Sequence, residues 1–233
     1  NAAVNAVDFY DAQTLATACD DYGVRVWNLA DIHNPQCTTP CLTSIQTVNF
    51  SPDGRRLIAM TDKQIARLWD TETGAAIVNL ATKNPVNKAV FSADSQRLAT
   101  AHAQQGVHVW DAQQGNLLAH LPTADDVATV DLVFRPDNQQ LATVDAQNQV
   151  RLWNLTRPLQ LVCGPQAPVI QSCFSGDGQR VATITEDGFA HVWNATTGET
   201  LFKQPLPLRA TTVSLDQDGT CLVTADSHQL IFW

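Results

Sequence analysis

Short segments in which apolar and polar residues alternate recur along the chain. Five of them end in Trp and carry Arg or His between two apolar residues; they occupy residues 24–27, 66–69, 107–110, 150–153 and 190–193. This period of two predicts half-buried antiparallel strands. A short apolar segment, such as residues 98–101 or 141–144, precedes each one, and no segment has the 3.6-residue period of a helix. The pattern therefore predicts an all-β chain.

Tryptophan marks a repeat that runs through the whole sequence. The six Trp residues lie 40 to 43 positions apart, at 27, 69, 110, 153, 193 and 233. A bulky residue precedes each of them by 18 or 19 positions: Phe9, Phe50, Phe91, Phe134, Phe174 and Leu215. A period of this length is typical of solenoids, propellers and arrays. Four short strands per repeat predict a β-propeller that forms a single domain over residues 1–233.

Strand counting leaves one repeat incomplete. Six sets of three inner strands are present, but only five outer strands lie between them, because residue 1 falls at an inner strand and Trp233 ends a third strand. Exposed strand edges favour aggregation. We therefore expect a segment of a larger protein, whose full ring has six or seven blades.

The repeats resemble those of the tryptophan–aspartate (WD) repeat family. Residues 50–70, which begin Phe-Ser-Pro-Asp-Gly and end Arg-Leu-Trp-Asp, are the clearest copy. The resemblance covers essentially the whole chain and implies a WD-repeat β-propeller with four antiparallel strands in each of six repeats. The Gly-His pair of the family pattern is missing, and the Ala- and Gln-rich copies are similar to bacterial ones.

The hydrogen-bonded set of Trp, Ser or Thr, His and Asp that the family uses is only partly present. Five repeats keep the hydroxyl residue, as Thr17, Thr100, Thr143, Thr183 and Thr224. A buried indole N–H needs an acceptor, so we expect each of these hydroxyl groups to accept from the Trp of its repeat. Ala59 stands at this position in the second repeat, and Trp69 is expected to need another acceptor.

The amino-acid composition disfavours two classes of binding partner, nucleic acid and membrane. The 233 residues include 14 Lys plus Arg and 23 Asp plus Glu, for a net charge of −9. A chain this acidic is poorly suited to nucleic acid, whose binding depends on clustered cations. No apolar run reaches the roughly 18–20 residues that span a bilayer. We expect a cytoplasmic protein that binds neither nucleic acid nor membrane.

The sequence contains no recognisable catalytic or metal-binding motif. A nucleophile elbow, a phosphate-binding loop, a zinc-protease motif and a calcium loop are all missing, so we expect no enzyme activity, cofactor or metal. His108 and His191 precede Trp by two positions, where other repeats have Arg. We interpret them as polar residues on a strand face; a ring of ligands around a channel would require matching residues in several repeats.

The family resemblance implies partner-binding positions at the rim of loops around the channel. Two such positions flank the start of the first strand of each repeat, and one lies in the turn before the third strand. Carried over to this sequence, the candidates are Asp20, Asp62, Glu186 and Asp226 in the turns, and Asn5, Gln46, Asn87, Val130, Ile170 and Arg209 on the first strands. Ala103 and Ala146 occupy the turn position in the third and fourth repeats. An acidic arc with an apolar notch suits a basic or amphipathic peptide; the alternative is an ordinary solvated acidic surface.

Three functions are compatible with these features. The preferred one is a non-enzymatic protein–protein interaction scaffold in signalling, whose partner is a protein, a peptide or another domain of the same polypeptide. A second is the sensor or autoinhibitory domain of a larger signalling ATPase, kinase or protease. A propeller hydrolase, which would need metal or catalytic groups at the channel mouth, is the remote alternative.

Overall fold

The computed structural model describes ten stretches of the chain, residues 3–21, 23–40, 44–80, 85–103, 105–123, 127–155, 160–163, 167–206, 210–226 and 229–233. Every regular element within them is a β-strand, which confirms the all-β prediction. These stretches include no helix of the length and apolarity required to cross a membrane. The chain divides into two compact units, residues 1–103 with 107–120 and residues 104–106 with 121–233.

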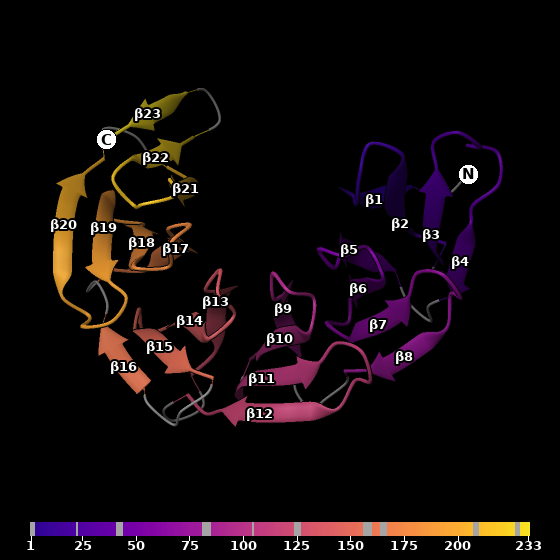
Figure 1. Cartoon of the computed structure of the whole chain (residues 1–233), viewed down its shortest axis with the longest axis horizontal. Helices are drawn as coiled ribbons and strands as arrows, with labels where there is room; N and C mark the ends of the chain where they lie inside the picture. The colour runs from indigo at the N-terminus through magenta and orange to yellow at the C-terminus, as the bar shows by residue number, and fades with distance from the viewer. Residues whose placement is uncertain are drawn as a thin grey trace. The chain divides into compact units, whose positions relative to one another are not determined.

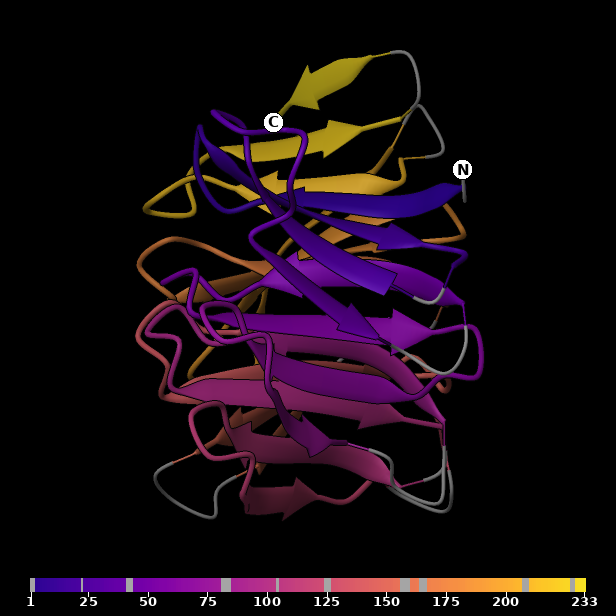
Figure 2. The same ribbon diagram turned by 90° about the vertical axis from the view of Figure 1, so that its right-hand side faces the viewer.

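The first unit holds three four-stranded sheets, whose strands are labelled in Figure 1. Sheet one comprises β1 (Val4–Phe9), β2 (Thr14–Cys19), β3 (Gly23–Asn28) and β4 (Cys37–Pro40). Sheet two comprises β5 (Ile45–Phe50), β6 (Arg56–Thr61), β7 (Ala66–Asp70) and β8 (Ala76–Asn79). Sheet three comprises β9 (Val86–Phe91), β10 (Arg97–His102), β11 (Gly106–Asp111) and β12 (Leu117–Leu121). In the side view of Figure 2, the three sheets of this unit follow one another from indigo through violet to magenta.

The second unit holds two four-stranded sheets and one with three strands. Sheet four comprises β13 (Thr129–Phe134), β14 (Gln140–Asp145), β15 (Val150–Asn154) and β16 (Gln160–Cys163). Sheet five comprises β17 (Val169–Phe174), β18 (Arg180–Thr185), β19 (Phe189–Asn194) and β20 (Thr200–Pro205). Sheet six comprises β21 (Thr212–Leu215), β22 (Leu222–Ala225) and β23 (Leu230–Phe232), with no fourth strand among the described residues. The five outer strands agree with the count made from the sequence.

The hydrophobic core lies between neighbouring sheets of each unit. In the first unit, Val26 of sheet one packs in one buried cluster with Leu57 and Trp69 of sheet two. In the second unit, Val192 of sheet five packs with Leu222 of sheet six. Fully burying one such aliphatic side chain contributes about 1.5–3 kcal/mol. Each sheet is therefore stabilised mainly by the sheet beside it.

The turn after the first strand is held by a Ser and an Asp two residues apart. The Ser51 hydroxyl donates to Asp53 over 2.6 Å and accepts from the Arg56 N–H over 2.9 Å. The same contacts recur in two further repeats, at residues 92–97 and 175–180. Gly54 has a φ of 69°, as such a turn requires. Contacts within the local sequence thus hold this turn in three repeats.

The indole N–H groups bond to the threonines that the sequence singles out. The Trp27 N–H donates to the Thr17 hydroxyl over 2.9 Å, across a hairpin that pairs β2 with β3. Equivalent bonds of 2.8 to 3.3 Å join Trp110 to Thr100, Trp153 to Thr143, Trp193 to Thr183 and Trp233 to Thr224. This prediction is confirmed in five repeats, in which the indole donor is buried or partly buried and is satisfied.

Replacing Ala59 with threonine should stabilise the protein. Ala59 is 1% exposed and lies opposite Arg67, as Thr17 lies opposite Arg25 in sheet one. The new hydroxyl would accept from the Trp69 indole, and a net hydrogen bond contributes about 0.5–1.5 kcal/mol to the free energy of unfolding. Urea denaturation of Ala59→Thr against Ala59→Val, which has the same shape without the hydroxyl, isolates this bond. Equal stability of the two variants would contradict the prediction.

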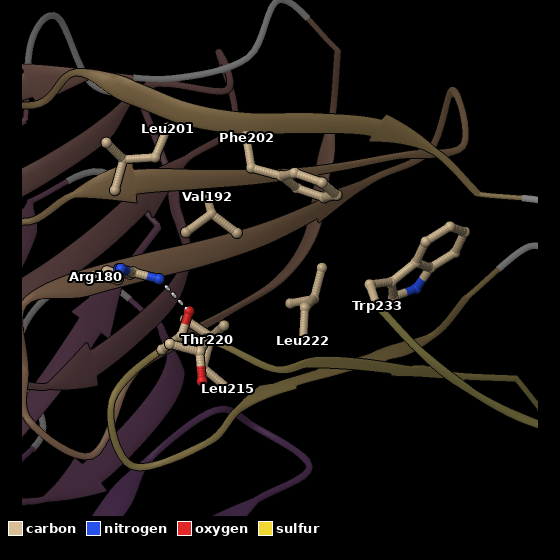
Figure 3. Close-up of a pocket in the computed structure, with 9 residues that line it drawn as sticks. Arg180, Val192, Leu201, Phe202, Leu215, Thr220, Leu222 and Trp233 are labelled. Carbon is tan, nitrogen blue, oxygen red and sulfur yellow. Dashed lines mark hydrogen bonds between the residues drawn. The ribbon is translucent and has the colours of Figure 1, made fainter.

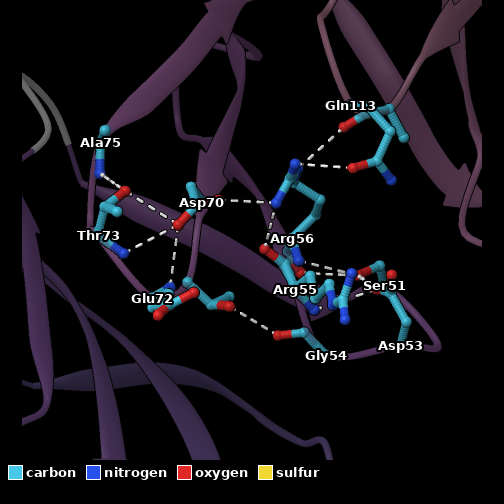
Figure 4. A network of polar contacts seen from close by, with 12 residues as sticks. Ser51, Asp53, Gly54, Arg55, Arg56, Asp70, Glu72, Thr73, Ala75 and Gln113 are labelled. Carbon is cyan, nitrogen blue, oxygen red and sulfur yellow. Dashed lines mark hydrogen bonds and ion pairs between the residues drawn. The ribbon is translucent and has the colours of Figure 1, made fainter.

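The Arg56 side chain links sheet two to sheet three through hydrogen bonds (Figure 4). Arg56 bonds Asp70 of its own sheet at 2.8 Å and donates across to the Gln113 side chain over 2.7 Å. Its Nε also donates to the backbone carbonyl of Ala112 over 3.2 Å. Ala112 and Gln113 belong to the turn that follows Trp110. The Arg56 guanidinium of sheet two thus stabilises the turn that follows Trp110 in sheet three.

Candidate functional site

In the first five repeats, a backbone hydrogen bond joins the turn position to the start of the first strand. The Asp20 N–H donates to the Ala3 carbonyl over 3.0 Å, and the Glu186 N–H donates to the Pro168 carbonyl over 2.8 Å. Asp62 to Ser44, Ala103 to Pro85 and Ala146 to Ala128 repeat this bond. The two kinds of candidate position therefore meet at one end of five sheets.

The sixth repeat departs from this arrangement. The Asp226 N–H donates to the Gln229 carbonyl over 3.2 Å, and the Asp226 side chain accepts from the Gln229 N–H over 2.9 Å. Asp226 thus closes its own turn. The candidate Arg209 lies outside the described residues.

Four polar residues of sheets one and two form a cluster at this end of the first unit. The Asn5 amide donates to the Asp20 carboxylate over 2.6 Å and to the backbone carbonyl of Ile45 over 3.0 Å. The Ser44 hydroxyl donates to Asp20 over 2.7 Å, and the Gln46 amide reaches Ser44 at 3.4 Å. These bonds, first that from Asn5 and then that from Ser44, lower the pKa of Asp20 below its usual value. The cluster therefore presents a fixed negative charge to solvent.

The other candidates of the first unit lie outside this cluster. Asp62 and Asn87 are both exposed, in the turn of sheet two and on the first strand of sheet three. They add charge and hydrogen-bonding capacity to the same end of neighbouring sheets.

In the second unit, two candidates line an open pocket of about 490 Å³. Ile170, which is 40% exposed, and the exposed Glu186 come from sheet five. Thr185 and Gly188 flank Glu186, and Thr211 closes the pocket from the segment that leads into sheet six. Val130, which is 44% exposed, holds the position of Ile170 on the first strand of sheet four and does not line the pocket. An apolar side chain beside a carboxylate is an arrangement that suits the stem and charge of a lysine or arginine.

The sequence did not single out Thr185 or Gly188. The signal that could have found them is their position beside Glu186 in the turn. Their role depends on the approach of the segment before sheet six, which is distant in the sequence and carries no local mark.

His108 and His191 lie on strands β11 and β19, as the sequence analysis interpreted them, and both are buried. His108 is 8% exposed and His191 is 5% exposed, and the Nδ1 atom of each ring has no hydrogen-bond partner. Burial lowers the pKa of His108 to about 4, helped by the neighbouring His102 and His120. Burial and then Lys203 lower the pKa of His191. Both rings are therefore neutral side chains of the core at physiological pH.

His102 is a residue that the sequence analysis missed. It is fully buried, and its Nε2 lies 2.8 Å from the Thr100 hydroxyl that accepts from Trp110. One repeat thus keeps a chain of Trp, Thr and His, although the Gly-His pair is missing. Within the described stretches, no three His, Cys, Asp or Glu side chains are grouped to hold a metal ion.

Comparison with known proteins identifies one repeat and the fold. Residues 113–154 match the family described as WD domain, G-beta repeat, over one period from β12 to β15. The chain is 36% identical over 81 residues to Protein HIR1 of Kluyveromyces lactis, which covers 28% of this chain and 9% of that protein. It is 34% identical over 62 residues to apoptotic protease-activating factor 1 of Danio rerio, covering 27% of this chain and 5% of that protein. The matched parts are thus less than a tenth of each relative.

A solved structure extends the likeness to almost the whole chain. The crystal structure of the computationally designed Ika8 protein matches 99% of this chain and 70% of its own with a TM-score of 0.81, at 18% sequence identity. Identity this low bears on the fold alone. The chain has a β-propeller fold and contains a WD-type repeat.

Proposed function

We propose that this chain is a non-enzymatic protein-interaction scaffold that binds a basic or amphipathic peptide at the rim. The observation that carries the proposal is the open pocket in which Ile170 lies beside the exposed carboxylate of Glu186. In the first unit, taken by itself, the equivalent turn of sheet one presents the charged Asp20 cluster. WD repeats in general serve protein–protein interaction, and the chain carries one.

Physical chemistry indicates how such a rim would select its partner. Net charge of −9 attracts cationic segments over about one Debye length, roughly 8–10 Å at physiological salt. Exposed charge pairs contribute only about 0.2–1 kcal/mol each. Ile170 adds an apolar contact with the peptide to these charge pairs. Affinity should therefore depend on salt and on an apolar residue next to each cation.

Reversing the charge of Glu186 should weaken binding of a cationic peptide about tenfold, equivalent to about 1.4 kcal/mol. The probe is a fluorescein-labelled peptide of alternating Lys and Leu, titrated with the chain at low and physiological salt. Asp62→Lys should act in the same direction, and Ile170→Ala should weaken binding at both salt concentrations. Fluorescence anisotropy measures each dissociation constant.

Glu199→Lys is the matched control, because Glu199 is exposed and lies at the opposite end of β19 from Glu186. It changes net charge by the same amount in the same unit. Equal loss of affinity in Glu199→Lys and Glu186→Lys would mean that only overall charge matters. No loss in either would leave an ordinary solvated surface as the explanation.

A second candidate is the sensor or autoinhibitory domain of a larger signalling protein, such as an ATPase, kinase or protease. Similarity over 62 residues to a protein named apoptotic protease-activating factor 1 favours it. In this function the rim would bind another domain of the same polypeptide. Mass spectrometry of the native gene product tests the idea: a mature chain without any further domain would contradict it.

A further inference from the structure

Three histidines of sheet three form a row across its second, third and fourth strands. The ring centres of His102 and His108 lie 4.5 Å apart, and those of His108 and His120 lie 4.8 Å apart. These residues belong to β10, β11 and β12, which are neighbours in the sheet and lie within the first unit. The row runs from a fully buried ring, His102, to an exposed one, His120. Half of the six histidines of the chain are thus gathered in one place.

The innermost ring is engaged within its own sheet. The Nε2 atom of His102 lies 2.8 Å from the Thr100 hydroxyl, which also accepts from the Trp110 indole. The His102 ring meets that of His108 edge-on, at an interplanar angle of 74°. His102 therefore positions the His108 ring and is not counted as a ligand, in agreement with the absence of a three-residue metal group in the described part of the chain.

His108 has no such engagement, although it is buried. Its Nδ1 atom lacks a hydrogen-bond partner, and the residue is only 8% exposed. Buried polar atoms of folded proteins are almost always paired, and an exception can mark a place where an ion binds. His120 stacks on His108 at an interplanar angle of 26° and is exposed, so the pair reaches the protein surface.

The equivalent places in the other four-stranded sheets carry different chemistry. There the residue two positions before Trp lies opposite Thr38, Asn79, Val162 or Lys203 of the fourth strand. In three of these four sheets that residue is an arginine, and in sheet five Lys203 adds a cation beside His191. Fixed positive charges such as these repel a metal ion. Among these described places, only sheet three brings two imidazoles together.

A pocket of the second unit shows the contrast (Figure 3). Its volume is about 350 Å³, and Val192, Leu222 and Trp233 form apolar walls. Arg180 lies at one end, where its Nη1 donates to the Gly219 carbonyl over 2.5 Å. The described residues that line this pocket include no His, Cys, Asp or Glu. Apolar walls and a guanidinium do not suit a metal ion, whereas the histidine pair of sheet three does.

The separation of His108 and His120 matches that of two ligands of one ion. Imidazole nitrogens bind zinc at about 2.0–2.1 Å, so the centres of two rings that share one ion lie roughly 4.5–5 Å apart. The observed separation is 4.8 Å. The rings are now nearly parallel, and rotation of the exposed His120 ring about χ2, a soft torsion, would turn both towards one ion. Rings this close disfavour a second positive charge, so one of them at least keeps the neutral form that binds metal.

We propose that His108 and His120 together bind one transition-metal ion, with copper(II) preferred over nickel(II) and zinc(II). Imidazole suits all three metals, and copper(II) stands highest in the Irving–Williams order of affinity. Water fills the remaining coordination positions. Because the two ligands stand on β11 and β12, the ion ties the fourth strand of the sheet to the third. The site shares no residue with the rim candidates and does not depend on peptide binding there.

Copper(II) alone is the probe, titrated at neutral pH into the full 233-residue chain with glycine present as a competing chelator. Isothermal titration calorimetry should show one site that His120→Ala and His108→Leu each weaken at least tenfold. Electron paramagnetic resonance of the copper-loaded protein should show two imidazole nitrogens on the ion. Nickel(II) and zinc(II) should bind the same site more weakly than copper(II).

Two histidines outside the row provide matched controls. His33→Ala removes an exposed histidine of the same unit, and His191→Leu removes the other buried histidine whose Nδ1 atom has no partner. Both variants should keep the copper affinity of the wild type. Thermal unfolding checks the fold of each variant, and His120→Ala keeps the test decisive if His108→Leu fails to fold, because His120 is exposed.

Unchanged copper affinity in His120→Ala would overturn the proposal, as would a resonance spectrum with a single imidazole nitrogen. An equal loss of affinity in His33→Ala would mean that copper spreads over surface histidines as an adventitious ion only, and would also overturn it.

Discussion

Replacing Asp145 with alanine should lower the free energy of unfolding by about 3–5 kcal/mol, the range for breaking a buried ion pair. The side chains of Asp145 and Arg151 are 1% and 9% exposed, and they form an ion pair within sheet four. Asp145 also accepts from the backbone N–H groups of Gln147 and Gln149, at 3.0 and 2.9 Å. Its removal leaves a buried guanidinium and two turn amides without their acceptor.

Urea denaturation followed by tryptophan fluorescence measures this effect. The matched control is Asp21→Ala, which breaks the exposed pair with Arg25 in sheet one, where the side chains are 39% and 25% exposed. An exposed pair contributes about 0–1 kcal/mol. Similar losses in the two variants would show that burial does not decide the strength of these pairs. Asp145→Ala combined with Arg151→Met should recover part of the loss, because no buried charge then lacks a partner.

Acidification should destabilise the first unit through His108. The pKa of this ring is lowered to about 4, chiefly by burial and then by His102 and His120, whose ring centres lie 4.5 and 4.8 Å away. In the unfolded chain the pKa is near 6.5. The stabilisation from a neutral ring is therefore complete above pH 6.5 and is lost as pH falls from 6.5 towards 4. The loss is at most about 3 kcal/mol, since one pKa unit corresponds to about 1.4 kcal/mol.

His108→Leu isolates this contribution, because it keeps an apolar side chain of similar size that does not titrate. Urea denaturation of both proteins between pH 7.5 and 4.5 should show the wild type losing stability more steeply. Carboxylates titrate in both proteins and cancel in the difference. Parallel profiles would contradict the prediction and would indicate that the histidine cluster rearranges to expose the ring.

The sequence predicted those parts of the fold that depend on contacts within one hairpin. Trp27 and Thr17 are ten residues apart, and the register of a single turn brings them together. The burial of His108 could not be predicted in this way. The ring lies beneath β12, and the length and register of that outer strand vary from one repeat to the next.

The candidate site could likewise be predicted only in the part that lies within one repeat. The family resemblance implied that Glu186 and Ile170 lie at one end of a sheet, and both line the same pocket. The pocket between them also requires Thr211, which belongs to the next repeat and approaches only when sheets five and six pack together.

The backbone bond that ties each rim turn to its first strand makes no demand on the side chain. Aspartate, alanine and glutamate all occupy the donor position, at residues 20, 62, 103, 146 and 186. Backbone architecture and side-chain identity are thus uncoupled at these places. Selection can replace the side chains of this surface one residue at a time, and a designer can randomise them, without disturbing the framework that displays them.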